Sequence, residues 1–553
     1  MDLEPTPLVT RSIWTFVWFT IVSVGTNAWW TWSSWSGFSI IAPLITLIGL
    51  IGLALVWTLP MTRMRVFAHV SFVASLCAVA LTTAPVLATT KFFITDSAAF
   101  NQLATQLFLK GHNPYSATFR ASMLLLHHPA SSWTYTLNGG HVDQVSYPAG
   151  SFLLLAPFQI LGIHHLGADW VDLLAWLLAA VILYVVSPSH IKWLSPLLLL
   201  TSLFTFTFAH GGTDSLFIPF MMIAALRWDA FVVLANSRWS RWIGPIALGV
   251  ACSLKQTPWF TVPFFIVGIA IEAERHDVPI VKTTLRYLGL IVAPFAAFNL
   301  PFIVWSPREW LHGTFLPLTQ PLVPDGQGLV TLATHGFARV VHTRNLQIAG
   351  FLLLLALLIA FFVWYPVFKR IWLLVLPIVL FVPSRSLSSY LVDFVPAALI
   401  AVITTQQVVH RPGVTPRRPL QVAAVFTPVF VAVVFITLAF SSPVLTVKVD
   451  RYSATAHGQF IGPLILTLTN TSSATVSPHV MVVVGSSHPD GFWTTPQTNN
   501  FMIKPHATVT TTFLPPKFTW APKQYENWLV EVMTSSPAAL STSPAFSWPY
   551  ASP

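Results

Sequence analysis

The sequence predicts a mostly α-helical, polytopic membrane protein that ends in a β-rich domain. Of its 553 residues, 54% are hydrophobic and 8% are charged, whereas soluble globular domains carry roughly 25% charged residues. From about residue 443 the long apolar runs give way to short β-branched segments. These observations exclude a soluble enzyme and divide the chain into a membrane domain, 1–442, and a second domain, 443–553.

Long apolar runs predict about thirteen transmembrane helices. A helix needs about 20 apolar residues to cross a hydrocarbon core of about 30 Å, although packed or broken helices are shorter. The predicted spans are 12–30, 38–60, 66–89, 169–187, 193–209, 214–232, 242–255, 258–272, 283–304, 347–366, 371–384, 388–408 and 421–441. The segment 150–163 is expected to dip into the membrane or lie on it. No small-residue cleavage site follows the first run, so we expect a retained span.

The positions of Lys and Arg in short loops predict the orientation. With the N-terminus inside, nearly all of them fall in cytoplasmic connections, and Lys255 and Arg385 are the exceptions on the outer side. We therefore expect a multi-pass protein of the plasma membrane with a cytoplasmic N-terminus and an extracytoplasmic C-terminal domain. Because charges at membrane depth are costly, the two exceptions are candidates for function.

The C-terminal segments predict a folded β domain. LTVKV, PLILTLTN, VMVVVG, ATVTTTF and WLVEVM are β-branched and separated by Pro, Gly, Ser and Asn turns, which is typical of an antiparallel, immunoglobulin-like β-sandwich. The two cysteines, Cys77 and Cys252, both lie in apolar runs. They supply neither a disulfide framework nor a cysteine metal site.

The most informative stretch is 92–115, which opens an outer loop that extends to about 149. Asp96 follows a long apolar run, and the residues after it predict an amphipathic helix that lies in the membrane interface and ends at Gly111. Asn113 and Tyr115 then flank a proline turn. A solvated helix end explains a lone carboxylate equally well. A carboxylate at the lipid–water boundary also suits a reaction between a lipid-borne donor and a polar acceptor.

Three further groups of polar residues lie on the predicted outer side. His141 and Asp143 form a His-x-Asp pair that suits metal binding or proton transfer, although surface polarity in a long loop is the commoner explanation. Tyr147 precedes a proline and resembles a residue that packs at the start of a helix. The turn His210-Gly-Gly-Thr-Asp214 leaves backbone amides free to face an anion or a sugar, and a plain hairpin favours the same glycines.

Lys255 is the strongest basic candidate. It ends a run, 243–255, which makes only about 20 Å of helix at 1.5 Å per residue, so it is expected below the outer surface. Pro258 then breaks the helix. A phosphate is the natural partner of an ammonium in this position, and a lysine that snorkels to the interface is the alternative.

Arg385 repeats this arrangement at the end of the short run 371–384, with Tyr390 and Asp393 on the next helix. If Asp393 pairs with Arg385, both are structural. A second outer loop, at about 305–345, is long and marked by Pro and Gly. Loops of this length are functional or disordered, and the tryptophans here favour order at the membrane surface, as a lid.

Five motifs taken together resemble one family of membrane enzymes. They are TDSAAFNQLATQLFLKGHNPY, SYPAGSFLLLAPF, HGGTDSLFIPFMMIAAL, LKQTPW and NLPFIVWSPREW. In this order they resemble the polyprenol-phosphate-sugar-dependent glycosyltransferases of the GT-C superfamily, closest to the bacterial mannosyltransferases of glycosyltransferase family 87. The resemblance covers about residues 85–400.

The resemblance implies a GT-C-like fold and transfer of a hexose, first of all mannose, with inversion. The donor would be a polyprenyl-phosphate sugar and the acceptor an extracytoplasmic lipid, glycan or protein. Asp96 would be the general base, and Lys255 with Arg385 would contact the donor phosphate. The expected substrate contacts are Asn113, Tyr115, His141, Asp143, Tyr147, His210, Asp214, Gln256 and Tyr390. No Asp-x-Asp or Asp-Glu pair follows Asp96, so no metal or other cofactor is indicated, and no nucleic acid partner is expected.

Three other functions compete with this one. A transporter or flippase for lipid-linked sugars also places charges in the membrane, although no inverted repeat is evident. A glycan ligase or polymerase uses a diphosphate donor, which favours more basic residues than are present. A non-catalytic anchor for the β domain does not require thirteen spans.

Overall fold

The computed structural model describes the fold of most of the chain, and all structural statements below refer to this described part. The residues outside it are 1–5, 33–37, 90–92, 94, 126–132, 164–166, 202–214, 234–237, 335–339, 406–426, 430, 433–442, 456–459, 485–490, 497–500, 517–526 and 549–553.

The protein is mostly α-helical. Its N-terminal helices are α1 (Pro7–Trp32), α2 (Phe38–Thr58), η1 (Met61–Arg63), α3 (Met64–Thr89), α4 (Asp96–Leu109), η2 (Pro114–Ser116), α5 (Arg120–Leu125), α6 (Gly150–Leu153), α7 (Ala156–Ile160), α8 (Gly167–Val186), η4 (Ser189–Ile191) and α9 (Leu194–Leu200). The later helices are α11 (Ile218–Ala225), α12 (Ala230–Val233), α13 (Arg238–Leu254), η5 (Thr257–Thr261), α14 (Val262–Arg275), α15 (Ile280–Trp305), α16 (Pro307–Thr319), α17 (Thr331–Thr334), α18 (Thr343–Val363), α19 (Tyr365–Phe368), α20 (Trp372–Leu380), α21 (Ser388–Val392) and α22 (Val395–Thr404).

Six of the described helices are long and apolar enough to cross a membrane. They are Pro7–Trp29, Ile40–Thr58, Met61–Thr89, Gly167–Val186, Ile280–Trp305 and Thr343–Val363, and they match six of the predicted spans. Other predicted spans appear as shorter helices, among them α9, α11 and α20, and the last, 421–441, lies largely outside the described residues. The count of thirteen spans therefore stays a prediction.

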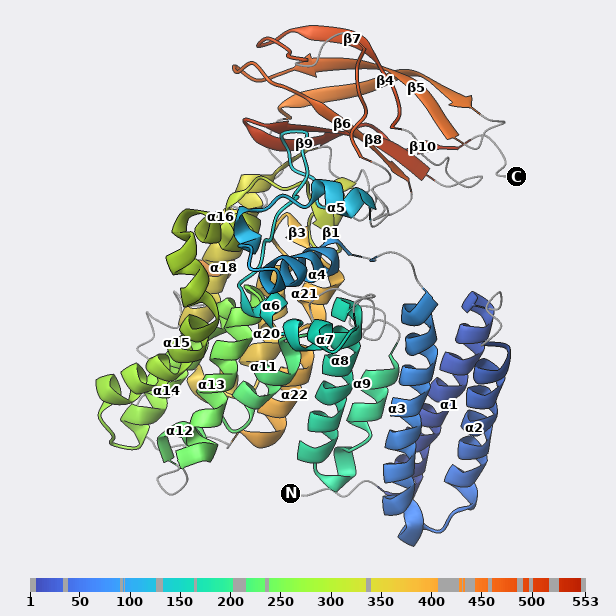
Figure 1. The fold of residues 1–553 in the computed structure, drawn as a ribbon, viewed down its shortest axis with the longest axis vertical. Helices are drawn as coiled ribbons and strands as arrows, with labels where there is room; N and C mark the ends of the chain where they lie inside the picture. Colours follow the sequence, from blue (N-terminus) through green and yellow to red (C-terminus); the bar gives the residue numbers. More distant parts are fainter. Residues whose placement is uncertain are drawn as a thin grey trace.

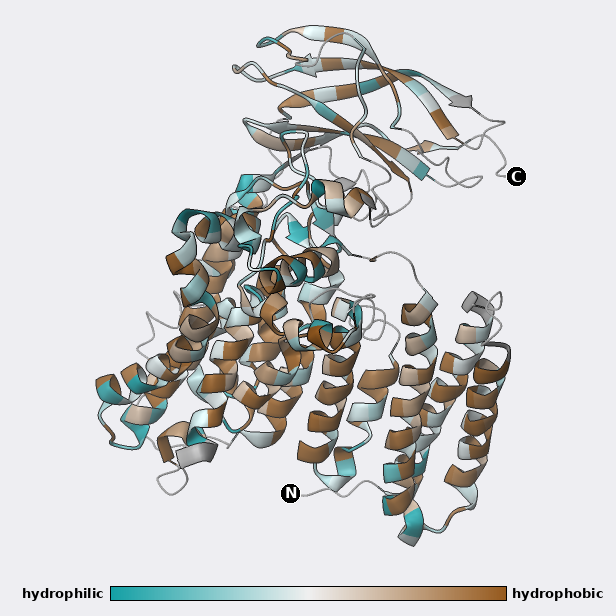
Figure 2. Cartoon of the chain, viewed as in Figure 1, coloured by the Kyte–Doolittle hydropathy of each residue, from teal (hydrophilic) through white to brown (hydrophobic). Residues whose placement is uncertain are grey.

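The helices form a layer with the β strands at one end. The N-terminal side of α1 and the short helix α12 lie at the opposite end, as does the turn between α14 and α15 (Figure 1). Along the layer the ribbon is predominantly apolar, and polar segments gather toward its ends (Figure 2). Buried side chains from helices α3, α8, α11, α13 and α14 share one large hydrophobic core.

The strands form two larger sheets. One has the order β4–β5–β7, and the other joins β10, β8, β9 and β2, with β6 paired to β8. The bounds are β4 (Leu445–Thr455), β5 (Phe460–Asn470), β6 (His479–Val484), β7 (Thr508–Phe513), β8 (Asn527–Ser535), β9 (Ala538–Thr542) and β10 (Phe546–Ser547). All five predicted strand segments are confirmed. Both sheets contribute to one core, which contains Leu466, Val482 and Trp528, whereas the immunoglobulin-like topology stays a prediction.

One strand of the second sheet comes from the helical part of the chain. β2 (Val340–His342) pairs antiparallel with β9, immediately before α18 begins. Below it, Leu137, Val323 and Leu346 are buried together with Met481 and Leu540. The C-terminal sheet is therefore packed onto the two predicted outer loops, a contact that the sequence did not predict.

The helix after Asp96 is more deeply buried than an amphipathic helix at the membrane surface would be, and its position at the interface stays a prediction. α4 ends at Leu109, close to the predicted end at Gly111, but its residues from Asp96 to Thr105 are all buried. Gln102 accepts a hydrogen bond from the Ala168 N–H through its side chain (3.2 Å), and the Thr105 hydroxyl donates to the Phe152 carbonyl (2.8 Å). Polar side chains at helical spacing on α4 thus form hydrogen bonds with backbone groups of α6 and α8 instead of facing water.

A buried ion cluster lies among the helices remote from the sheets. Lys369, which follows α19, is 2.9 Å from Asp229 and 3.0 Å from Glu272, and all three side chains are only 4% exposed. The Tyr365 hydroxyl donates to Glu272 (2.7 Å). Asp229 adjoins α12 and Glu272 lies on α14, so the cluster ties three distant segments together.

Candidate functional site

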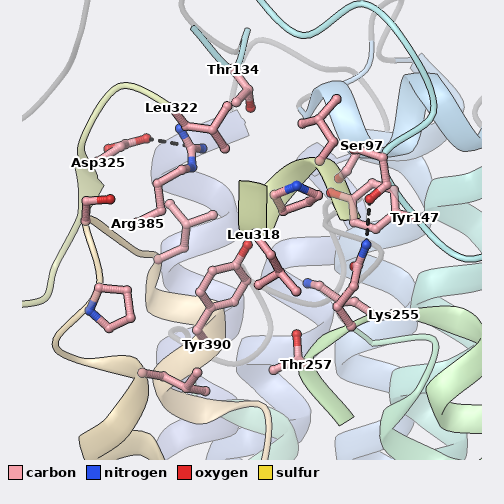
Figure 3. A pocket seen from close by; sticks show the side chains of 18 of the residues that line it. Ser97, Thr134, Tyr147, Lys255, Thr257, Leu318, Leu322, Asp325, Arg385 and Tyr390 are labelled. Carbon is pink, nitrogen blue, oxygen red and sulfur yellow. Dashed lines mark hydrogen bonds and ion pairs between the residues drawn. The ribbon is translucent and has the colours of Figure 1, made fainter. Parts of the chain in front are cut away.

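A cavity of about 360 Å³ opens between the helical layer and the two predicted outer loops. Its polar lining comes from segments that are far apart in the sequence, as seen for Ser97, Lys255 and Arg385 in Figure 3. The polar residues that line it are Thr95, Asp96, Ser97, Thr134, Ser146, Tyr147, Lys255, Gln256, Thr257, Asp325, Gln347, Ser384, Arg385 and Tyr390. Six of the twelve predicted site residues are therefore brought together: Asp96, Tyr147, Lys255, Gln256, Arg385 and Tyr390.

Asp96 is held at the first turn of α4. Thr95 caps the helix by accepting from the Ala98 N–H (3.3 Å), and Asp96 Oδ2 accepts from the Thr134 N–H at 2.9 Å. The residue is 9% exposed, and its carboxylate lies at the positive end of the helix dipole. Asp96 lines the cavity, so its carboxylate can be reached by a substrate hydroxyl.

The loop segment that holds Asp96 is itself anchored. The Val142 N–H donates to the Thr134 carbonyl (2.8 Å), and the Val323 N–H donates to the Tyr135 carbonyl (2.9 Å). Leu137 donates to the Pro321 carbonyl in the same way (2.8 Å). The two outer loops predicted from the sequence thus form one hydrogen-bonded unit above the cavity.

Lys255 is buried in the cavity wall, as its short helix predicts. It follows α13 directly and is 4% exposed. In Figure 3 it points toward Ser97 and Tyr147, and its ammonium lies 4.9 Å from the centre of the Tyr390 ring. The carboxylates whose charges act on it are Asp393 and Asp172.

The suggested pairing of Asp393 with Arg385 is wrong. Asp393 is fully buried, and neither of its carboxylate oxygens has a hydrogen-bond partner in the described part of the chain. Arg385 instead lies in β3 (Arg385–Ser386), where its Nη2 is 3.9 Å from Asp325 and its Nη1 donates to the Val323 carbonyl (3.3 Å). The physical reason is that Asp393, at the end of α21, is buried in the helical core, whereas the arginine contacts Val323 and Asp325 of the second predicted outer loop.

Asp325 is a site residue that the sequence analysis missed. It lies in β1 (Asp325–Gly326), which pairs in parallel with β3 and so brings Asp325 beside Arg385. The signal was the acidic residue in the Pro-Asp-Gly turn of the outer loop. The predicted order of this loop is confirmed, because α16 and β1 occupy much of it.

Gly326 allows the two short strands to approach. Its φ is +116°, and an added Cβ would overlap the Ser386 carbonyl oxygen. We expect Gly326→Ala to destabilise the protein by about 2 kcal/mol or more, because both the backbone conformation and the contact disfavour a side chain. Thermal unfolding in detergent measures this effect. Gly289→Ala is the matched control, since a Cβ there meets no atom within 4 Å; equal melting temperatures for the two variants would contradict the assignment.

Gln256 lines the cavity but also has a structural duty. Its Nε2 donates to the carbonyls of Ser146 (2.8 Å) and Thr314 (2.6 Å). The side chain therefore joins the end of α13 to the first outer loop and to α16. Its remaining amide oxygen is the part that a ligand can contact.

Several predicted substrate contacts lie elsewhere. Asn113 accepts from the Tyr115 N–H (3.0 Å), and Tyr115 is buried with its hydroxyl donating to the Tyr147 carbonyl (2.8 Å). Neither lines the cavity, because the turn folds Tyr115 into an aromatic cluster rather than back to the surface. His141 and Asp143 lie in the anchored loop but not on the cavity wall. The predicted contacts His210 and Asp214 lie outside the described residues.

Among the described residues no group of three His, Cys, Asp or Glu side chains is placed to hold a metal ion. The acidic residues nearest the cavity, Asp96 and Asp325, belong to different walls and have their own partners, Thr134 and Arg385.

Comparisons with protein-family models, curated proteins and solved structures found no match to this chain.

Proposed function

We propose that this protein is an integral-membrane glycosyltransferase. It would move a hexose, first of all mannose, from a polyprenyl-phosphate donor to an extracytoplasmic acceptor with inversion. The observation that carries this proposal is the meeting of the Asp96 carboxylate with two basic residues, Lys255 and Arg385, in one cavity. A base and cations that can bind a phosphate are the groups that this transfer requires.

Asp96 suits the role of general base. Transfer requires that the acceptor hydroxyl lose its proton as its oxygen attacks the anomeric carbon. The bond from that carbon to the phosphate oxygen breaks, and the proton passes to the carboxylate. The Thr134 amide holds one carboxylate oxygen, which fixes the orientation of the other.

Lys255 and Arg385 suit the leaving phosphate. The polyprenyl phosphate departs as an anion, and positive charges aimed at its oxygens stabilise the developing charge. The apolar lining of the same cavity, which includes Phe260, Leu318 and Phe351, suits the first part of a polyprenyl chain. The cavity thus combines phosphate-binding and lipid-binding surfaces.

The end of the helical layer at which the cavity lies supports an extracytoplasmic reaction. The cavity is lined by the loops next to the β strands, whereas η1, with Arg63, and the end of α14, with Arg275, lie toward the other end of the layer (Figure 1). Under the positive-inside rule the end rich in Arg and Lys is cytoplasmic. The proposed location is the plasma membrane, with the β domain outside.

The direct test incubates the purified protein in detergent with radiolabelled polyprenyl-phosphate mannose and membrane extract. We expect the label to move from the lipid into an acceptor fraction. A protein that leaves the donor intact but moves it between the leaflets of sealed proteoliposomes would instead be a flippase, and the proposal would be wrong.

Lys255→Met tests the phosphate contact. We expect the KM for the donor to rise about tenfold to a hundredfold, because a charge-assisted hydrogen bond is lost. Lys110→Met is the control, since Lys110 is exposed at the end of α4. Removing the ammonium also leaves Asp393 without its countercharge, so a Lys255→Met/Asp393→Asn double variant checks folding. If the donor KM is unchanged in Lys255→Met and in the double variant, Lys255 does not contact the donor phosphate.

A further inference from the structure

Three basic side chains gather where two helices begin, at the end of the helical layer remote from the β strands (Figure 1). Arg241 lies in the first turn of α13, and Lys282 and Arg286 lie in the first two turns of α15. The Arg286 guanidinium lies over the ring of Trp242, the residue after Arg241, so the two helices begin side by side. This basic cluster, Arg241, Lys282 and Arg286, does not belong to the cavity that holds Asp96.

The basic cluster carries positive charge that the described part of the chain does not balance. No carboxylate there forms an ion pair with its three members. Asp229 and Glu272, the buried carboxylates of adjoining segments, are bound to Lys369 instead. The first turns of α13 and α15 contain no acidic residue, and cations at the start of a helix oppose the positive end of its dipole. An anion bound at this place would therefore stabilise both helices.

Aromatic rings hold the two arginines of the basic cluster. The guanidinium carbon of Arg286 lies 5.6 Å from the centre of the Trp242 ring, and that of Arg241 lies 4.9 Å from the centre of the Phe231 ring. A guanidinium that stacks on a ring is pre-organised, and its N–H groups can bind the oxygens of a phosphate. Charges that serve only to orient a protein in the membrane need no such support, because the positive-inside rule counts Lys and Arg alike.

An exposed apolar strip continues from Arg286 along α15, one of the helices long and apolar enough to cross a membrane. Leu285 is 61% exposed and Val292 is 49% exposed. Gly289 lies between them, and a Cβ there would meet no atom within 4 Å. Residues three and four apart share one face of a helix, so this strip lies directly beyond the guanidinium of Arg286. A lipid whose headgroup meets Arg286 would find open apolar surface for its acyl chains.

We propose that Arg241, Lys282 and Arg286 bind the headgroup of an anionic phospholipid, with its acyl chains along α15. The phosphate of such a lipid accepts charge-assisted hydrogen bonds from the arginines, and its chains cover the apolar strip. A zwitterionic lipid brings an ammonium that the basic cluster repels, and a soluble phosphate compound leaves the strip uncovered. Basic groups between membrane helices on the cytoplasmic side suit this kind of ligand. The inference does not depend on the proposed glycosyl transfer.

The test measures single lipid binding by native mass spectrometry of the full-length protein in detergent. The probes are dioleoylphosphatidylglycerol, which is anionic, and dioleoylphosphatidylcholine, which has the same chains and a zwitterionic headgroup. We expect wild-type protein to bind the anionic lipid with a Kd at least about tenfold lower. In Arg241→Gln/Arg286→Gln this Kd should rise about 25-fold, since each basic residue near an anionic lipid contributes about fivefold. The Kd for the zwitterionic lipid should change less than about twofold.

Arg63→Gln/Arg65→Gln is the matched control. It removes two exposed arginines from the start of α3, and thus the same amount of charge, and we expect the Kd for the anionic lipid to stay within about twofold of wild type. If both double variants raise this Kd equally, the lipid responds only to overall charge and the assigned site is wrong. Equal Kd values of wild-type protein for the two lipids would also overturn the proposal.

Two further measurements keep the test decisive. Arg286 is exposed, so Arg286→Gln alone is expected to keep the fold and to raise the Kd for the anionic lipid about fivefold; an unchanged Kd removes this arginine from the site. Glycerol 3-phosphate supplies the phosphate without acyl chains. We expect no displacement of the lipid when the two are present at equal concentrations. Displacement of half of the lipid under these conditions would mean that the site binds soluble phosphate compounds and not a lipid.

Discussion

Asp96→Asn is expected to lower the transfer rate about 10²-fold to 10⁴-fold, the range that a positioned general base contributes. The amide has nearly the shape of the carboxylate and can still accept from the Thr134 N–H, so the fold is kept. It cannot take the proton of the acceptor hydroxyl. Initial rates of mannose transfer from polyprenyl-phosphate mannose, measured at saturating donor, quantify the loss.

Asp143→Asn is the matched control for this experiment. Asp143 lies in the same anchored loop, but it does not line the cavity, and its backbone carbonyl, rather than its side chain, accepts from the Phe119 N–H (2.6 Å). We expect a rate within about twofold of wild type, since surface changes away from a site have small effects. Equal rates for Asp96→Asn and Asp143→Asn would show that Asp96 is not the base.

Lys369→Ala is expected to produce the largest loss of stability. Its ammonium lies between Asp229 and Glu272, and the three side chains are only 4% exposed. Removing the ammonium takes the shared countercharge from two buried carboxylates, and breaking a buried ion pair in this way costs about 3–5 kcal/mol. We expect a strongly lowered melting temperature in detergent. Near-ultraviolet circular dichroism, recorded during heating, measures this temperature.

The surface pair Lys448–Asp450 provides the comparison. Its nitrogen–oxygen distance is 2.8 Å, similar to that of the buried cluster, but the Lys448 side chain is 77% exposed. Water and salt screen such a pair, so Lys448→Ala should leave the melting temperature unchanged. A Lys369→Ala melting curve that overlays that of Lys448→Ala would mean that the buried cluster does not hold α12, α14 and α19 together.

Much of the fold was predictable because its signals are local. Apolar runs predicted helices such as α3 and α15, and alternating β-branched residues predicted strands such as β5 and β8. The break after Lys255 followed from Pro258 and a run too short for a full span. These features depend on neighbours within a few turns of the chain, and such neighbours are visible in the sequence.

The exposed or buried state of polar residues was less predictable. Asn101, Gln102 and Thr105 have the spacing of a polar helix face, yet they are buried and bonded to other segments. The sequence predicts Lys369 as one more basic residue of a cytoplasmic connection. In the structure it forms the centre of the buried ion cluster. A polar residue inside a protein differs from one on its surface only through partners that come from distant segments.

The sequence by itself determined that this is a helical membrane protein with a β-rich end, and it marked Asp96, Lys255 and Arg385 as charges in unusual places. Only the tertiary structure decided that these three line one cavity, that Asp325 rather than Asp393 pairs with Arg385, and that β2 enters the C-terminal sheet. The reason is that each of these contacts joins residues far apart along the chain. Such contacts depend on how whole elements pack, which local periodicity does not encode.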